Sequence, residues 1–119
     1  MSTFDFGFDD FEDSPREGHL KELVAAYEDD PSSYFDSGDL EEIASFYFED
    51  GRIEKAAAAA KAAVEANPMS VNFHRTHGMI LMRQGRDDAA RKALKRALEL
   101  DESDVTARSL LERLAEQSV

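Results

Sequence analysis

The fold is decided by GRIEKAAAAAKAAVEA at residues 51–66 and GRDDAARKALKRALEL at residues 85–100, two stretches that superimpose at an offset of 34 residues. The identical pairs are Gly51 and Gly85, Arg52 and Arg86, Ala56 and Ala90, Ala59 and Ala93, Lys61 and Lys95, Ala63 and Ala97, and Glu65 and Glu99. Identities at one fixed offset are typical of repeated structural units. Alanine has the highest helix propensity, and its small side chain lets neighbouring helices approach closely. Each stretch therefore predicts a helix that packs against a neighbour.

The sequence before these stretches predicts two further helices. Residues 14–17, SPRE, combine a capping box with Pro in the first turn, so a helix begins there, and residues 29–31, DDP, end it. The apolar residues of this helix, at helical spacing, are Leu20, Leu23, Val24 and Tyr27. After the linker of residues 32–38, acids in a first turn and an apolar stripe predict the next helix. That stripe consists of Leu40, Ile43, Ala44 and Tyr47.

This helix–turn–helix unit of 34 residues resembles the tetratricopeptide repeat family. Where the family has a large apolar residue, Leu, Gly and Tyr in its first helix, the first copy has Leu40, Ile43, Ala44 and Tyr47, and the second has His74, His77, Gly78 and Leu81. Where the family places Ala, Phe, Ala and a final Pro, the first copy has Ala56, Ala60, Ala63 and Pro68, and the second has Ala90, Leu94, Ala97 and Glu102. Gly51 and Gly85 fall in the turn between the helices. The resemblance covers roughly residues 37–117.

The resemblance implies an all-α fold of helix–turn–helix repeats, an α-α superhelix, with an N-terminal helix and a C-terminal capping helix. A capping helix is expected because each repeat buries its apolar face only against a neighbour. The expected organisation is a tail at residues 1–13, the N-terminal helix and linker at 14–36, repeat 1 at 37–70, repeat 2 at 71–104 and the capping helix at 105–119.

The first residues carry a distinct pattern. Residues 4–13, FDFGFDDFED, alternate aromatic and acidic residues without a helical period, which predicts a mobile tail. Two interpretations are open: the tail is a docking peptide, or it is a strand-like arm on its own domain. As a docking peptide it is expected to bind the second repeat of the same or another copy, because positive charge lies there. That charge is on Arg91, Lys92, Lys95 and Arg96, with Arg75 and Arg83 nearby in sequence.

Charge is unevenly distributed along the 119 residues, whose net charge is −12. Residues 1–50 carry 16 acids and 2 bases, whereas residues 51–119 carry 10 acids and 12 bases. An acidic half and the lack of a long basic face argue against a nucleic-acid partner and favour a basic protein or peptide partner. Adaptation to a salty cytoplasm explains the same acidity equally well, since carboxylates then serve hydration.

Several classes of protein are excluded by what the sequence lacks. Without cysteine there is no disulfide scaffold, Cys-based zinc site or thiol nucleophile. No apolar stretch approaches the roughly 20 residues that span a bilayer, and the first residues are acidic where a secretory signal is basic, so a cytoplasmic protein with no membrane partner is expected.

No catalytic or metal-binding constellation stands out. His74 and His77 are three residues apart and could share a metal, but no cysteine could help to hold it and both fall where the repeat places core residues. We expect packed, hydrogen-bonded histidines and no cofactor. Paired carboxylates such as Asp87 and Asp88 point to different faces of a helix, and no Gly-rich phosphate loop or nucleophile motif occurs, so an enzyme is not expected.

The resemblance implies a partner-binding groove lined by the first helix of each pair, taking a peptide or protein segment as a non-enzymatic adaptor. The matching residues are Glu41, Glu42, Ser45, Phe48, Glu49, Asn72, Arg75, Thr76, Met79, Met82 and Arg83. Chaperone-binding family members clamp a terminal carboxylate with Lys, Arg and Asn. Here the corresponding positions hold Glu41, Ser45, Thr76, Thr106 and Leu110, which does not support that specificity.

Two further alternatives are open. Met79 and Met82 next to Phe48 form an adaptable apolar patch or simply cover the core. The chain is alternatively a self-associating scaffold that forms homodimers through its repeats, because a short solenoid leaves an unfilled end.

Overall fold

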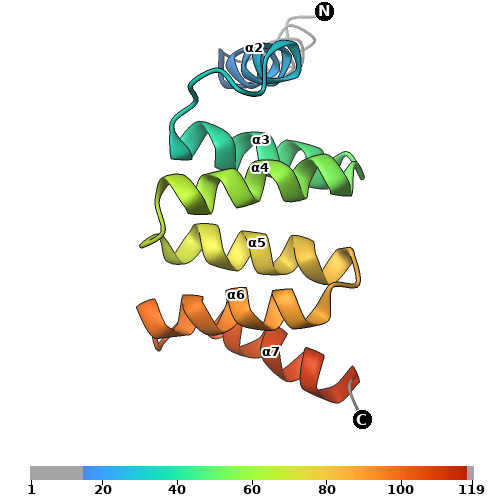
Figure 1. Ribbon diagram of the computed structural model, residues 1–119, viewed down its shortest axis with the longest axis vertical. Coiled ribbons are helices and arrows are strands. Elements are labelled where there is room, and N and C mark those ends of the chain that lie inside the picture. The colour runs from blue at the N-terminus through green and yellow to red at the C-terminus, as the bar shows by residue number, and fades with distance from the viewer. Residues whose placement is uncertain (1–14, 118–119) are drawn as a thin grey trace, which may run out of the picture. The chain divides into compact units, whose positions relative to one another are not determined.

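The computed structural model describes residues 15–117, with side chains from residue 18 onward, and every regular element in that range is a helix (Figure 1). The helices are α2 (Pro15–Asp29), α3 (Ser37–Glu49), α4 (Ile53–Ala66), α5 (Val71–Arg83), α6 (Asp87–Leu100) and α7 (Val105–Gln117). The predicted all-α fold is confirmed. The tail of residues 1–13 and the capping residue Ser14 lie outside the described residues, so the statements about them stay predictions.

The chain divides into two units between Tyr34 and Phe35. The first unit contains α2, which begins at Pro15 as the sequence predicts. Along its predicted apolar face Val24 is buried, and Leu20, Leu23 and Tyr27 are half-buried. The second unit contains α3 to α7.

Helix α3 begins at Ser37, inside the predicted linker, because Asp36 caps it. The Asp36 backbone is extended, and its carboxylate accepts a hydrogen bond of 2.8 Å from the backbone N–H of Asp39. Ser70 caps α5 in the same way, accepting from the backbone N–H of Phe73 at 3.2 Å. The two first helices of the repeats therefore start from equivalent caps 34 residues apart.

The turns inside the two helix pairs are built alike around a left-handed glycine. Gly51 has a φ of 80° and Gly85 a φ of 77°, a region that residues with a Cβ avoid. In each turn the residue after the glycine donates back into the preceding helix: Arg52 N–H to the Tyr47 carbonyl and Arg86 N–H to the Leu81 carbonyl, both at 2.9 Å. These are the bonds of a Schellman motif, which satisfies carbonyl groups that the helix end leaves free.

Small residues form most of the core between the helices. Alanines 56, 59, 60 and 63 of α4 are completely buried. In the second pair Ala90, Leu94 and Ala97 of α6 are completely buried, and they cluster with Leu81 of α5 and with Ala107 and Leu114 of α7. Alanine at these positions lets helix axes approach closely, so burial is achieved with little side-chain volume.

Helices α3 to α7 pack in order, each against the next, and lie one after another in Figure 1. The alternate helices α3 and α5 also contact each other, as do α5 and α7. The first helices of the repeats thus form a continuous row with α7, and that row positions the candidate site.

Candidate functional site

The row of α3, α5 and α7 carries two adjoining hollows. One has a volume of about 260 Å³ and is lined by Ser45, Phe48, Glu49, Thr76, Met79 and Ile80. The other has a volume of about 320 Å³ and is lined by Phe48, Met79, Met82, Arg83, Leu110, Arg113 and Gln117. Phe48 and Met79 line both, so the two hollows form one depression, which we call the α3–α5–α7 groove.

The spacing of residues on α5 explains how the groove arises. Thr76, Met79 and Arg83 follow one another at intervals of three and four residues, so they share one face of the helix. On α3 Phe48 and Glu49 lie three and four residues after Ser45, so these residues also share one face of their helix. Because α3 packs against α5, the two faces lie side by side and together make the groove.

Seven of the residues predicted from the sequence line the groove: Ser45, Phe48, Glu49, Thr76, Met79, Met82 and Arg83. The other four do not line it: Glu41, Glu42, Asn72 and Arg75. Of these four, Glu41, Asn72 and Arg75 form hydrogen bonds within the protein, and Glu42 is exposed on α3. A role for any of them in ligand binding stays a prediction.

Glu41 is a half-buried carboxylate that bridges α3 and α5. Its Oε2 accepts a hydrogen bond of 2.8 Å from the hydroxyl of Thr76, whereas its buried Oε1 has no partner among the described residues. Burial raises the pKa of Glu41 above its ordinary value, and the Thr76 hydrogen bond and the positive charge of Arg75 oppose that rise. The hydrogen bond to Thr76 therefore ties α3 to α5 beside the groove.

Arg75 ties α5 to the start of α7. Its guanidinium donates to Asn72 Oδ1 on its own helix and to Asp104 Oδ2. The Asp104 side chain is only 4% exposed, and its Oδ1 accepts from the backbone N–H of Ala107 at 3.0 Å, which caps α7. Arg75 thus holds the capping residue of the next helix.

The opposite side of the groove is positively charged. The Arg83 guanidinium lies over the Phe48 ring, 5.2 Å from its centroid, which is within the range of a cation–π interaction. Arg113 of α7 lines the same hollow. The groove therefore has an apolar floor of Phe48, Met79 and Leu110 between a glutamate on α3 and arginines on α5 and α7.

Helix α7 contributes Leu110, Arg113 and Gln117 to the groove. From the sequence, Leu110 was named only as a position equivalent to the carboxylate clamp, and Arg113 and Gln117 were missed. The signal was present, because an offset of 34 residues places Arg113 and Gln117 on Met79 and Arg83. Ile80, which is completely buried under the groove, was also missed.

The two predicted core histidines differ from each other. His74 is buried and its Nε2–H donates to the Pro68 carbonyl at 2.7 Å, which confirms a packed, hydrogen-bonded side chain. His77 is half-buried and lines a separate pocket on another face of α5. The described part of the chain contains no cluster of three His, Asp or Glu side chains suited to a metal ion. None of its helices is long and apolar enough to cross a membrane.

Stacked helix pairs with a groove along their first helices define a helical repeat protein. The tetratricopeptide repeat family profile matches residues 42–105, which is more than half of the chain, so the protein belongs to the tetratricopeptide repeat family. The resemblance noted in the sequence is thereby confirmed. No curated protein matches the sequence significantly.

Several solved structures are similar in fold. The first tetratricopeptide repeat domain of Spaghetti (RPAP3), bound to the HSP90 peptide SRMEEVD, has a TM-score of 0.72 at 18% identity, covering 95% of this chain and 87% of that one. The type III secretion chaperone SycD of Yersinia enterocolitica, in complex with a peptide of the translocator YopD, has a TM-score of 0.71 at 16% identity, covering 98% and 92%. MamA has a TM-score of 0.74 at 18% identity, and this chain spans 63% of its length. At such identities the likeness shows the fold alone.

Proposed function

We propose that this protein is a non-enzymatic adaptor that binds a peptide or protein segment in the α3–α5–α7 groove. The observation that carries the proposal is the groove itself, an apolar floor of Phe48, Met79 and Leu110 between side chains of opposite charge. Apolar hollows with a few charged groups at their edges are typical of peptide recognition, because burial supplies affinity and the charges fix orientation. Two structures of similar fold, those of RPAP3 and SycD, contain a bound peptide, which supports peptide binding by this protein as well.

The charges of the groove describe the peptide that would fit. Glu49, with Glu41 and Glu42 on the same helix, favours a basic residue at the α3 side. Arg83 and Arg113 favour an acidic residue at the α7 side. We infer an apolar anchor flanked by one basic and one acidic group. The proposed partner is therefore not basic throughout. Its basic residue faces the acidic α3 side of the groove, and its acidic residue faces the arginines.

A random peptide library selected against the full chain tests the proposal. Selected peptides should share an apolar centre with opposite charges on either side. Met79→Lys should weaken their binding about thirtyfold, because a central hot-spot residue contributes about 2 kcal/mol. The matched control is Met69→Lys, since Met69 is 65% exposed and lines neither hollow.

A charge exchange provides the second measurement. Arg113→Glu should select against peptides with an acidic residue and leave the thermal unfolding unchanged, since Arg113 is exposed. The proposal is wrong if folded Met79→Lys protein binds the selected peptides as tightly as the unmodified chain. Sedimentation of the same samples tests the homodimer alternative, which predicts a concentration-dependent dimer.

A further inference from the structure

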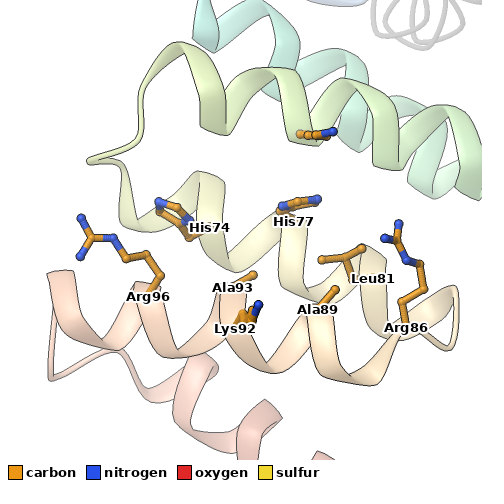
Figure 2. Close-up of a pocket in the computed structure, with 9 residues that line it drawn as sticks. His74, His77, Leu81, Arg86, Ala89, Lys92, Ala93 and Arg96 are labelled. Atoms are coloured by element: carbon orange, nitrogen blue, oxygen red, sulfur yellow. The ribbon is translucent and has the colours of Figure 1, made fainter.

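A third hollow, of about 350 Å³, lies on another face of the repeats and shares no residue with the groove. We call it the basic pocket. It is lined by Lys61, His74, His77, Leu81, Arg86, Ala89, Lys92, Ala93 and Arg96 (Figure 2). On α5 its residues His77 and Leu81 are about half a helical turn from Met79 and Arg83, so the basic pocket and the groove use opposite faces of one helix.

Four cations surround this pocket and most of them have no carboxylate partner. Lys61, Arg86 and Lys92 are exposed and form no ion pair with any carboxylate in the described part of the chain. Arg96 pairs with Glu99 at 3.0 Å, on its own helix. Like charges held together without partners raise the energy of the free protein, so an anionic ligand gains affinity by relieving that repulsion.

The floor of the pocket has a different chemistry. Leu81, Ala89 and Ala93 are apolar, and His77 lies between them and α4 (Figure 2). Burial lowers the pKa of His77, and the positive charges of His74, Arg86 and Lys61 lower it further, against an opposite effect of Glu65. The neutral ring then extends the apolar floor at neutral pH, and it becomes a fifth positive charge when it is protonated.

The spacing of the cations selects the size of the ligand. Arg86 and Arg96 lie at opposite ends of the pocket in Figure 2 and are ten residues apart on or beside α6. A helix rises about 1.5 Å per residue, so their backbones are separated by about 15 Å. The two guanidinium groups do not turn towards each other in Figure 2, so an extended ligand fits the pair better than a single phosphate group. An extended peptide, which rises about 3.3 Å per residue, spans this distance in four to five residues.

We propose that the basic pocket binds an acidic peptide segment whose carboxylates flank apolar side chains. One carboxylate pairs with Arg86 at one end of the pocket and another pairs with Lys92 and Arg96 towards the other end, Lys61 adds positive charge from α4, and the apolar side chains cover Leu81, Ala89 and Ala93. This is a site separate from the proposed adaptor groove, and its ligand carries negative charge, as the acidic first half of the chain does.

A suitable probe is a synthetic peptide of residues 4–13, FDFGFDDFED, because Asp5 and Asp9 are four residues apart with two phenylalanines between them. It is titrated into the full chain, whose own five acids within residues 1–13 are replaced by the corresponding amides so that only the added peptide carries this pattern. Amide and histidine-ring NMR shifts are recorded. We expect shifts at His77, Ala89 and Ala93, tighter binding at pH 6 than at pH 8, and loss of binding at high salt.

Two lysines of α6 provide a matched pair of variants. Lys92→Glu should weaken the peptide about tenfold, which corresponds to about 1.4 kcal/mol. Lys95→Glu changes an equally exposed lysine three residues away that does not line the pocket, and should change the affinity less than about twofold. The peptide with amides in place of its acids should not bind.

Three outcomes overturn the proposal. Equal weakening by Lys92→Glu and Lys95→Glu would mean a general charge effect rather than a site. Shifts confined to Phe48 and Met79 would place the peptide in the groove instead. Displacement of the peptide by an equal concentration of inorganic phosphate would mean a simple counterion site.

Discussion

Gly78 of α5 lies so close to Leu94 of α6 that a Cβ atom on Gly78 would be 2.7 Å from both Cγ and Cδ2 of the leucine. Leu94 is completely buried, so it has no open space into which to move. The equivalent residues in the first repeat are Ala44 and Ala60, both also completely buried. The two repeats thus fill the same interhelical contact in two ways, with glycine opposite leucine or with two alanines.

Gly78→Ala should therefore destabilise the protein although alanine is the better helix former. Overpacking a buried contact costs about 1–3 kcal/mol, and the gain in helix propensity returns about 1 kcal/mol. We expect the free energy of unfolding to fall by about 1 kcal/mol, as measured by urea denaturation. Gly18→Ala is the control, because a Cβ on Gly18 meets no atom within 4 Å and the change should be neutral or stabilising.

A double variant tests whether Gly78 and Leu94 are coupled. Leu94→Ala alone should cost about 2–5 kcal/mol, as truncations of buried leucine do. Gly78→Ala combined with Leu94→Ala recreates the alanine pair of the first repeat. The double variant should therefore lose less stability than the sum of the losses of the two single variants. If the losses of the two single variants simply add in the double variant, Gly78 and Leu94 are not coupled.

Arg75 should contribute to stability through Asp104. Arg75→Ala leaves a buried carboxylate with only the Ala107 N–H as a partner, which should lower the free energy of unfolding by about 3 kcal/mol. Arg75→Ala combined with Asp104→Asn should lose less, because the amide removes the buried charge and still caps α7. Chemical denaturation measures both, and equal losses would contradict the coupling.

Gly85 tests the turn geometry. At a φ of 77° a β-branched side chain is strained, so Gly85→Val should lower the free energy of unfolding by about 1–2 kcal/mol. Gly85→Asn should cost much less, because asparagine tolerates the left-handed region. If the two variants have the same free energy of unfolding, the left-handed conformation of residue 85 does not limit the stability of the turn.

The fold was predictable because its information is periodic. The offset of 34 residues, the turn glycines and the small residues at Ala56 and Ala90 are local patterns that can be counted in the sequence. The start of α3 was less predictable, because residues 32–38 were expected to be a linker, whereas Asp36 caps the helix and it begins at Ser37. The close contact between Leu94 and Gly78 was also not predictable, because the two residues lie on different helices.

The candidate site was predictable in part for the same reason. Repeat register places Phe48, Met79 and Arg83 on one face, and those three do line the groove. The repeat register cannot show which polar residues already form hydrogen bonds within the protein. Arg75 and Thr76 are neighbours that were both predicted to line the groove, yet Arg75 binds Asp104 while Thr76 binds Glu41. The basic pocket combines residues from three helices, so no single stretch of sequence displays it.

His77 should make stability depend on pH. Its pKa in the folded protein lies below the ordinary value of 6.5, chiefly because of burial, with the charges of His74, Arg86 and Lys61 adding to the effect. As pH falls through 6.5, the unfolded chain takes up a proton before the folded one does, so stability decreases, and the loss is complete below the folded pKa. His77→Gln removes this proton uptake. Between pH 7.5 and pH 5.5 the variant should therefore lose less stability than the unmodified chain, as measured by urea unfolding at both pH values. The histidine-ring NMR signal gives an internal check, because His77 should titrate at a lower pH in the folded protein than in urea. Identical titration in both states would show that the pocket does not hold the ring neutral.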